Sequence, residues 1–197
     1  MQKLIIASNN PGKLREFQFL LQPLGIEVLT QAQLGIAEAE EPHLTFIENA
    51  LAKARHVSLI SGLPALADDS GICVAALNGA PGVFSARYAG EPKSDARNNA
   101  KLLQDMLGVA DRRAHYYCVL VLVHHADDPQ PLIAEGEWHG EIAHEERGDG
   151  GFGYDPLFWL PELGRMSAEL SRDEKHAISH RGRAIRVLLE KLKVQPV

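Results

Sequence analysis

The chain contains little cysteine, few aromatic residues and no excess of positive charge. Of its 197 residues two are cysteine and 6% are aromatic, and the formal net charge at pH 7 is -6. Two cysteines are too few for the disulfide framework of a small secreted domain, and a chain of this length buries a core without one. The acidic balance argues against a general binder of nucleic acid or of a membrane surface, because such proteins display a basic face.

Long hydrophobic runs are also missing. The longest apolar run, residues 119–123, is far shorter than the ~20 residues of a membrane span, and the N-terminal run is too short for a signal peptide. Cys73 and Cys118 lie in apolar, strand-like segments, where cysteine usually serves as a small core residue in a reducing compartment. We therefore expect a soluble, cytoplasmic protein with no membrane and no nucleic-acid partner.

Short apolar runs and longer segments with helical spacing alternate along the chain, separated by turn residues. Strands are expected at residues 3–7, 26–29, 63–67, 116–123, 132–138 and 156–160, and residues 72–76 are expected to continue extended beyond the strand at 63–67. The strands at 116–123 and 132–138 are expected to form a long antiparallel hairpin. This mixture predicts an α/β fold, with a mixed sheet flanked by helices, in a single domain of residues 1–197 that has two lobes.

Capping residues and apolar spacing predict helices that begin at Thr45, Ser94 and Ser171. The first is expected to end near residue 61 and to bury Ile47, Ala50, Leu51, Ala54 and Val57. The second, residues 94–107, is expected to bury Leu102, Leu103, Met106 and Leu107.

The opening of the chain has the order strand, polar turn, helix. The turn reads Ser8-Asn9-Asn10-Pro11-Gly12-Lys13. Exposed amides at a helix N-terminus favour an anion, and Lys13 adds a mobile positive charge, so this turn is a candidate phosphate site. It is not a Walker loop, since Ala7 replaces the first glycine of that motif and Leu14 follows the lysine. An ordinary turn with a solvated lysine is the alternative interpretation.

Asp68-Asp69-Ser70 follows an apolar run that predicts a buried strand. Adjacent carboxylates at a buried strand end are costly unless positive charge lies among them, and a divalent cation such as Mg²⁺ satisfies this condition. Neighbouring side chains of a strand point to opposite faces, so one carboxylate is expected to face the cleft and the other to pair elsewhere. The acidic loop 38–41 offers a further carboxylate. A turn role for Asp69 and a solvated charge run for the loop are the alternatives.

The glycine-dense segment 148–153 matches the dinucleotide-binding pattern G-x-G-x-x-G, but no strand-to-helix context surrounds it, so that interpretation fails. The segment instead presents Phe152 and Tyr154, whose rings are able to stack a base, and Asp155, which either bonds a sugar or holds the loop. A structural loop with Phe152 in the core is the alternative.

A basic cluster lies at residues 175–183, in a chain that is otherwise acidic. If the segment is helical, Lys175 and Ser179 share a face and the next turn adds His180 and Arg181. The cluster therefore provides positive charge for a phosphate. The alternative is a helix C-terminus whose basic residues only complement the helix dipole.

Six segments together resemble the Ham1/inosine triphosphate pyrophosphatase family, and they do so along the whole chain and in the same order. They are residues 8–13, Thr45-Phe46-Ile47-Glu48-Asn49-Ala50, 67–71, 79–88, Gly151-Phe152-Gly153-Tyr154-Asp155-Pro156 and Ser179-His180-Arg181. The resemblance implies a bacterial, Mg²⁺-dependent homodimer with a long twisted sheet and an active-site cleft between its two lobes. The implied reaction is hydrolysis of ITP, dITP and XTP to the monophosphate and pyrophosphate.

The resemblance also implies roles for individual residues. Asp69 prepares the attacking water, Lys13 assists, and Asp69 with Glu40 or Glu41 holds the metal. The triphosphate lies on Ser8, Asn9, Asn10, Pro11, Gly12 and Lys13. The remaining substrate contacts are Ser70, Phe152, Gly153, Tyr154, Asp155, Lys175, His180 and Arg181.

Two rival functions follow from the same residues. A Maf-type nucleotide pyrophosphatase has a similar architecture but other substrates, and the motif set argues against it. A non-catalytic nucleotide- or RNA-binding module also uses a phosphate loop and stacking aromatic residues. The Asp68-Asp69 pair argues against this second rival, because a polyanion binder gains nothing from carboxylates beside the phosphates unless a metal joins them.

Overall fold

The structure, a computed structural model, describes residues 3–21 and 25–194. Seven strands in these ranges form one sheet in the order β2-β1-β3-β4-β5-β6-β7. The strands are β1 (Lys3–Ile6), β2 (Glu27–Thr30), β3 (Ala65–Val74), β4 (Arg113–Val123), β5 (Leu132–Ile142), β6 (Phe158–Leu160) and β7 (Arg165–Met166). β1 pairs in parallel with β2 and β3, whereas β6 pairs antiparallel with β5 and β7. The predicted mixed sheet is therefore confirmed.

Five α-helices accompany the described strands. They are α1 (Pro11–Leu21), α2 (Phe46–Ser61), α3 (Asp95–Asp105), α4 (Arg172–Ile178) and α5 (His180–Val194). No described helix is both long enough and apolar enough to cross a membrane.

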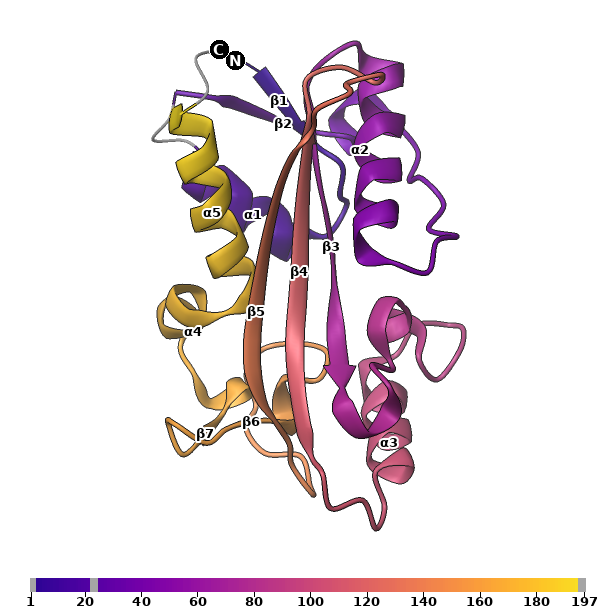
Figure 1. The fold of residues 1–197 in the computed structure, drawn as a ribbon, viewed down its shortest axis with the longest axis vertical. Coiled ribbons are helices and arrows are strands. Elements are labelled where there is room, and N and C mark those ends of the chain that lie inside the picture. The colour runs from indigo at the N-terminus through magenta and orange to yellow at the C-terminus, as the bar shows by residue number, and fades with distance from the viewer. Residues whose placement is uncertain (1–2, 22–24, 195–197) are drawn as a thin grey trace. The chain divides into compact units, whose positions relative to one another are not determined.

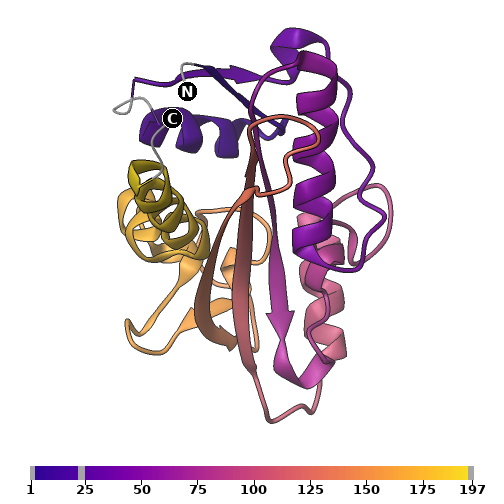
Figure 2. The ribbon, with the colours of Figure 1, turned by 45° about the horizontal axis from the view of Figure 1, so that its top comes forward.

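The chain divides into two compact units. Unit 1 comprises Met1–Asp69, Val119–Glu135 and Ala184–Val197, and unit 2 comprises Ser70–Cys118 and Gly136–Arg183. In unit 1, α2 lies on one side of the strands and α1 with α5 on the other (Figure 1). The view in Figure 2 shows the same arrangement of α2 and α1. In unit 2, α3 lies beside the end of β3 (Figure 1).

Helix α2 begins and ends where its sequence predicts. The hydroxyl of Thr45 accepts a hydrogen bond from the amide of Glu48, and Gly62 ends the helix in the left-handed region with φ 68°. Its buried residues include Asn49 and Ser58, whereas Ile47 is exposed. The expectation that Ile47 faces inward was wrong because the buried stripe of α2 is partly polar, which a count of apolar positions does not detect.

Helix α3 follows the same pattern. Ser94 caps it, and Leu102 and Met106 are fully buried. Leu107 is 78% exposed, so its predicted burial was wrong. The helix ends at Asp105, and beyond that end the helical spacing no longer determines which side a residue faces.

The largest correction concerns β3. The sequence predicts a short strand at 63–67 that ends at the acidic pair and an extended segment at 72–76 beyond it. The structure instead has one continuous strand, β3, of ten residues from Ala65 to Val74 with both carboxylates inside it. Asp68 is 2% exposed and Asp69 is 8% exposed. Turn-like composition predicted an end here, and the pairing of the carboxylates with lysines described below allows the strand to continue.

The basic segment is also interrupted, since α4 ends at Ile178 and Ser179 has an extended backbone. Lys175 and Ser179 therefore do not share one helical face. The Ser179 hydroxyl accepts the amide hydrogen of Gly182 in the first turn of α5. A Cβ atom on Gly182 would lie 1.9 Å from the carbonyl oxygen of His176, so only glycine fits this close approach.

We predict that Gly182→Ala lowers the free energy of unfolding by about 1 to 3 kcal/mol, because the backbone of α4 has to move to admit the methyl group. Urea denaturation followed by circular dichroism measures this loss. Arg186→Ala, at an exposed position of the same helix, is the control and should stay within about 0.5 kcal/mol of the parent chain. Equal stability of both variants would contradict the close approach.

Candidate functional site

The two adjacent carboxylates of β3 each bind a lysine from a different helix of unit 1. The ammonium of Lys13, in the first turn of α1, lies 2.7 Å from Oδ2 of Asp68, and the ammonium of Lys53 on α2 lies 3.2 Å from Oδ1 of Asp69. Asp68 and Asp69 thus have partners on different helices, in line with neighbouring strand side chains that point to opposite faces, and both carboxylates are paired with a lysine. The expectation that Lys13 is a mobile charge was wrong, because its ammonium is paired with Asp68.

Lys53 connects this strand to the acidic loop. Its ammonium also lies 2.6 Å from Oε1 of Glu41, and only 13% of the Lys53 side chain is exposed. Burial raises the pKa of Asp69, while the charge of Lys53 opposes that rise. Burial lowers the pKa of Lys53, but the charges of Asp69, Asp68 and Glu41 outweigh it, so its pKa is raised. Lys53 is therefore held as a cation that two carboxylates share.

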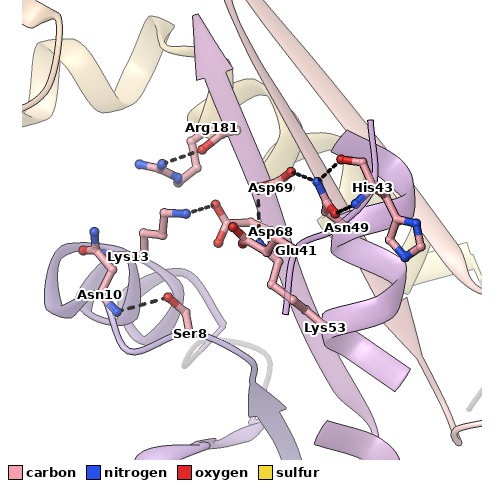
Figure 3. Close-up of polar contacts among 11 residues, drawn as sticks. Ser8, Asn10, Lys13, Glu41, His43, Asn49, Lys53, Asp68, Asp69 and Arg181 are labelled. Atoms are coloured by element: carbon pink, nitrogen blue, oxygen red, sulfur yellow. Dashed lines mark hydrogen bonds and ion pairs between the residues drawn. The ribbon is translucent and has the colours of Figure 1, made fainter. Parts of the chain in front are cut away.

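A buried amide completes the cluster. Asn49, four residues before Lys53 on α2, donates a hydrogen bond from Nδ2 to Oδ2 of Asp69 at 3.4 Å. Figure 3 shows Asn49 lying between Asp69 and His43. Sequence reasoning missed both Asn49 and Lys53 as site residues. The signal available was two polar residues, four apart, on the helix face that also carries the buried alanines.

The opening turn satisfies part of its own hydrogen bonding. Oδ1 of Asn10 accepts the amide hydrogens of Gly12 and Lys13 at 2.9 and 3.2 Å, and Oγ of Ser8 accepts that of Asn10. Asn10 is thus the N-cap of α1, and a phosphate at these amides has to compete with its side chain. Asn9 is exposed, and the side chain of Pro11 lies outside the described part of the structure.

The carboxylates of this cluster suit a hard divalent cation. Within the described residues no group of three or more histidine, cysteine, aspartate or glutamate side chains is arranged to hold a metal ion. Glu41 and Asp69, however, already converge on one positive charge, the ammonium of Lys53, and Mg²⁺ in nucleotide sites commonly takes one or two carboxylates and completes its shell with water and phosphate. Glu40 is exposed, whereas Glu41 is the residue of the acidic loop that pairs with Lys53.

A second polar cluster lies in unit 2 around the glycine-dense loop. Asp155 is 2% exposed and accepts hydrogen bonds from the Phe152 amide and the Ser167 hydroxyl, both at 2.9 Å. It also pairs with the ammonium of Lys175, which lies 4.8 Å from the centre of the Phe152 ring. Asp155 therefore holds the loop. A Cβ atom on Gly151 would collide with it at 2.1 Å.

The aromatic residues of this loop separate into two roles. Phe152 is 57% exposed, so the alternative that placed it in the core was wrong. Tyr154 is 4% exposed and belongs to the hydrophobic core of unit 2, and its hydroxyl donates to the carbonyl of Ser85 at 2.7 Å. The ring of Tyr154 therefore faces the core, and Phe152 is the ring presented to solvent for stacking.

Two residues of α3 hold the peptide groups between these rings. A carboxylate oxygen of Asp95 accepts the Gly153 amide hydrogen at 2.7 Å, and Nδ2 of Asn99 donates to the Gly153 carbonyl at 3.1 Å. Asp95 and Asn99 lie four residues apart and share one face of the helix. Sequence reasoning did not assign either residue to the site, because the contact joins segments more than fifty residues apart.

His180 and Arg181 are both 7% exposed. The His180 ring is stacked on Tyr116, with centroids 4.8 Å apart and an interplanar angle of 10°, and the centroid of the Trp138 ring lies 6.4 Å from that of His180. A guanidinium nitrogen of Arg181 lies 3.3 Å from the Ser70 hydroxyl, to which it donates. The structure thus brings Ser70 and Arg181 together as predicted site residues.

Comparison with known sequences gives one consistent family. The model of the Ham1 family matches residues 4–191 of the chain. A protein of Ralstonia nicotianae named dITP/XTP pyrophosphatase is 65% identical, and the alignment covers 98% of each chain. One of Nitrosomonas europaea with the same name is 66% identical, and the alignment covers 98% of this chain and 95% of the relative.

Solved structures agree with the sequence comparison. A HAM1 protein from Coxiella burnetii superimposes with a TM-score of 0.96 at 48% identity, covering 99% of this chain and 100% of the other. The Ham1 protein of Staphylococcus aureus superimposes with a TM-score of 0.90 at 40% identity, covering 98% of both chains.

We predict that Lys53→Met destabilises the protein by about 2 to 3 kcal/mol at pH 7.5, because it leaves Glu41 and Asp69 close together without their shared cation. The pKa of Asp69, already raised by burial, rises further in the variant. The native state then binds a proton that the unfolded chain releases above about pH 4, so the loss of stability relative to the parent chain grows as pH rises and shrinks towards pH 5.

Chemical denaturation at pH 5 and pH 7.5, without divalent metal, measures this difference. Lys101→Met is the matched control, since it removes the more exposed ion pair with Asp105 in α3. The control should lose less than about 1 kcal/mol, and by a similar amount at both pH values. A loss for Lys53→Met that is independent of pH would contradict the assigned charge balance.

Proposed function

We propose that this chain, which belongs to the Ham1 family, hydrolyses the non-standard purine nucleoside triphosphates ITP, dITP and XTP to the monophosphate and pyrophosphate. The observation that carries the proposal is the cluster in unit 1, in which Asp69, Asp68 and Glu41 are buried or half-buried against two lysines. Such a cluster supplies a carboxylate for a water and positive charge for phosphates. The substrate class comes from the names of the relatives that are about two-thirds identical.

The proposed chemistry needs no covalent intermediate. Attack of water on the α-phosphorus requires a positioned water and neutralised phosphate oxygens, with pyrophosphate as the leaving group. Asp69 accepts the proton of the attacking water, and its raised pKa brings it closer to neutral pH as a base. When substrate enters, Lys13 and Lys53 exchange a carboxylate contact for a phosphate contact, so both are positioned before binding.

The proposed cofactor is Mg²⁺, held by Asp69 and Glu41, with Glu40 as the other acidic residue named from the sequence. When bound, Mg²⁺ neutralises phosphate charge and lowers the pKa of a coordinated water. The residues of the opening turn, Ser8 to Lys13, bind the triphosphate in this proposal. The phosphate competes with the Asn10 side chain for the first amides of α1, which suits a site that has to release its product.

The purine base is assigned to the polar cluster of unit 2. Phe152 offers the exposed ring for stacking, while Gly153 and Tyr154 contribute backbone, and Asp155 holds Lys175 in place beside that ring. A 6-oxo purine presents an acceptor where adenine presents an amino donor. Donors on His180, Arg181 and Ser70 therefore favour ITP and XTP over ATP, because the wrong base leaves buried polar groups unpaired.

The proposed enzyme is a cytoplasmic homodimer. A Maf-type pyrophosphatase of other substrate range and a non-catalytic nucleotide-binding module remain the rival functions. The Ham1 family match along nearly the whole chain disfavours the first, and the buried carboxylates beside the lysines disfavour the second.

With Mg²⁺ present, we expect the purified protein to release pyrophosphate from ITP, dITP and XTP at a kcat/KM at least about 100-fold higher than from ATP or GTP. A coupled pyrophosphate assay measures the rates, and chromatography identifies the monophosphate. Orthophosphate as the first product, or equal rates on ATP, would exclude the proposed function. Binding without turnover would instead support the binding module.

We expect Asp69→Asn to lower kcat by about 10² to 10⁴-fold while the protein stays folded and still binds ITP, because the amide cannot accept the proton of the attacking water. Steady-state kinetics and isothermal titration calorimetry test the two halves of this statement. Asp111→Asn, which changes an exposed carboxylate paired with Arg113, serves as the control. A fully active Asp69→Asn variant would remove Asp69 from the mechanism.

A further inference from the structure

Asn49 contacts both the Asp69 carboxylate of β3 and the backbone of His43, just after the acidic loop 38–41. It is 1% exposed on α2. Its Oδ1 accepts the amide hydrogen of His43 at 3.0 Å, and its Nδ2 donates to the carbonyl of His43 at 3.1 Å. Both polar atoms of the Asn49 side-chain amide are therefore hydrogen-bonded to the backbone of one residue, His43, in the segment 38–43 that contains the acidic loop.

The same Nδ2 reaches the catalytic carboxylate of the proposed reaction. It lies 3.4 Å from Oδ2 of Asp69, while Lys53 occupies Oδ1 of that carboxylate (Figure 3). The two oxygens of Asp69 thus have separate donors, both from α2. This leaves the carboxylate plane little freedom to rotate, because rotation breaks one contact or the other.

The loop that Asn49 holds also carries Glu41. His43 follows Glu41 by two residues, so fixing both polar groups of the His43 backbone limits how far the Glu41 side chain can move from Lys53. Asn49 is therefore connected, through the loop and through a direct hydrogen bond, to both carboxylates that flank the Lys53 ammonium.

We propose that Asn49 is a positioning residue for the reaction, which sets the orientation of Asp69 and at the same time locks the acidic loop that presents Glu41. This inference rests on the proposed pyrophosphatase function. In this proposal Asn49 touches neither the phosphates nor the base, and it acts through Asp69 and Glu41.

Only a side chain with an acceptor and a two-hydrogen donor at the length of asparagine makes all three contacts. Aspartate keeps the acceptor for the His43 amide but loses both donated bonds and places a like charge beside Asp69. Serine is too short to replace the two opposed bonds to His43. Asn49→Asp therefore removes the contact to Asp69 with almost no change in shape.

The decisive test compares Asn49→Asp with Asn98→Asp. Asn98 is the matched control, since it is also buried, accepts the amide hydrogen of Ala89 and donates to two backbone carbonyls, those of Ser85 and Ala86. In both variants two donated bonds are lost and the acceptor is kept. The difference is that one of the two acceptors of Asn49 is the Asp69 carboxylate, whereas both acceptors of Asn98 are backbone carbonyls.

For Asn49→Asp we expect kcat on ITP to fall about 10- to 100-fold with KM within about threefold of the parent value, as for residues that orient a reacting group. For Asn98→Asp we expect kcat within about threefold at a similar fall in melting temperature. Equal loss of kcat in both variants, or unchanged kcat in Asn49→Asp, would overturn the proposal. A parent protein that releases no pyrophosphate from ITP would overturn the proposed function first, so the two failures are distinguishable.

Amide hydrogen exchange tests the loop contact without turnover. In Asn49→Ala the acceptor for the His43 amide is gone, so exchange in the segment 38–43 should accelerate at least about tenfold, while the strands of unit 2 keep their protection. Unchanged exchange in this segment would show that Asn49 does not lock the loop and would overturn that half of the proposal.

Discussion

The structure depends on how two negative charges are stabilised inside a strand of the central sheet. Asp68 and Asp69 lie in the middle of β3, and their side chains are nearly excluded from water. Isolated charges at such a place would be too costly to keep. Lys13 from α1 and Lys53 from α2 provide the compensating charge. The ionised state of the two aspartates therefore depends on the packing of both helices against the sheet.

This arrangement also explains why the cluster suits phosphates. A lysine that already faces a carboxylate has given up much of its hydration and conformational freedom, so transfer to a phosphate oxygen costs less than it would for a solvated side chain. In unit 2, hydrogen bonds hold the proposed base-binding groups in place before substrate binds. Asp155 from within the loop, and Asp95 and Asn99 from α3, fix the backbone that presents Phe152. In each unit, groups that do not contact substrate in the proposal hold those that do.

Much of this could be predicted from the sequence, and the limits have physical causes. The mixed sheet, the caps at Thr45 and Ser171 and the need of the Asp68-Asp69 pair for nearby positive charge follow from local periodicity and from the cost of burying charge. Extended backbone on both sides of the acidic pair was predicted from the sequence. That Asp68 and Asp69 lie inside one continuous strand was not, because it depends on lysines that come from other elements. The same holds for Asn49, Lys53 and Asn99, which lie on helices and become site residues only through packing across the fold. Tyr154 was named from the sequence as a residue that could stack a base, yet its ring is buried in the core, while Phe152, two residues before it, is exposed.

The central claim is that the carboxylate and lysine cluster of unit 1 directs water at the α-phosphorus. Hydrolysis of ITP in water enriched in ¹⁸O, followed by mass spectrometry of both products, tests it most directly. The account predicts that one ¹⁸O atom enters the nucleoside monophosphate and that pyrophosphate remains unlabelled. Label in the pyrophosphate would mean that water attacks the β-phosphorus, and it would contradict the account.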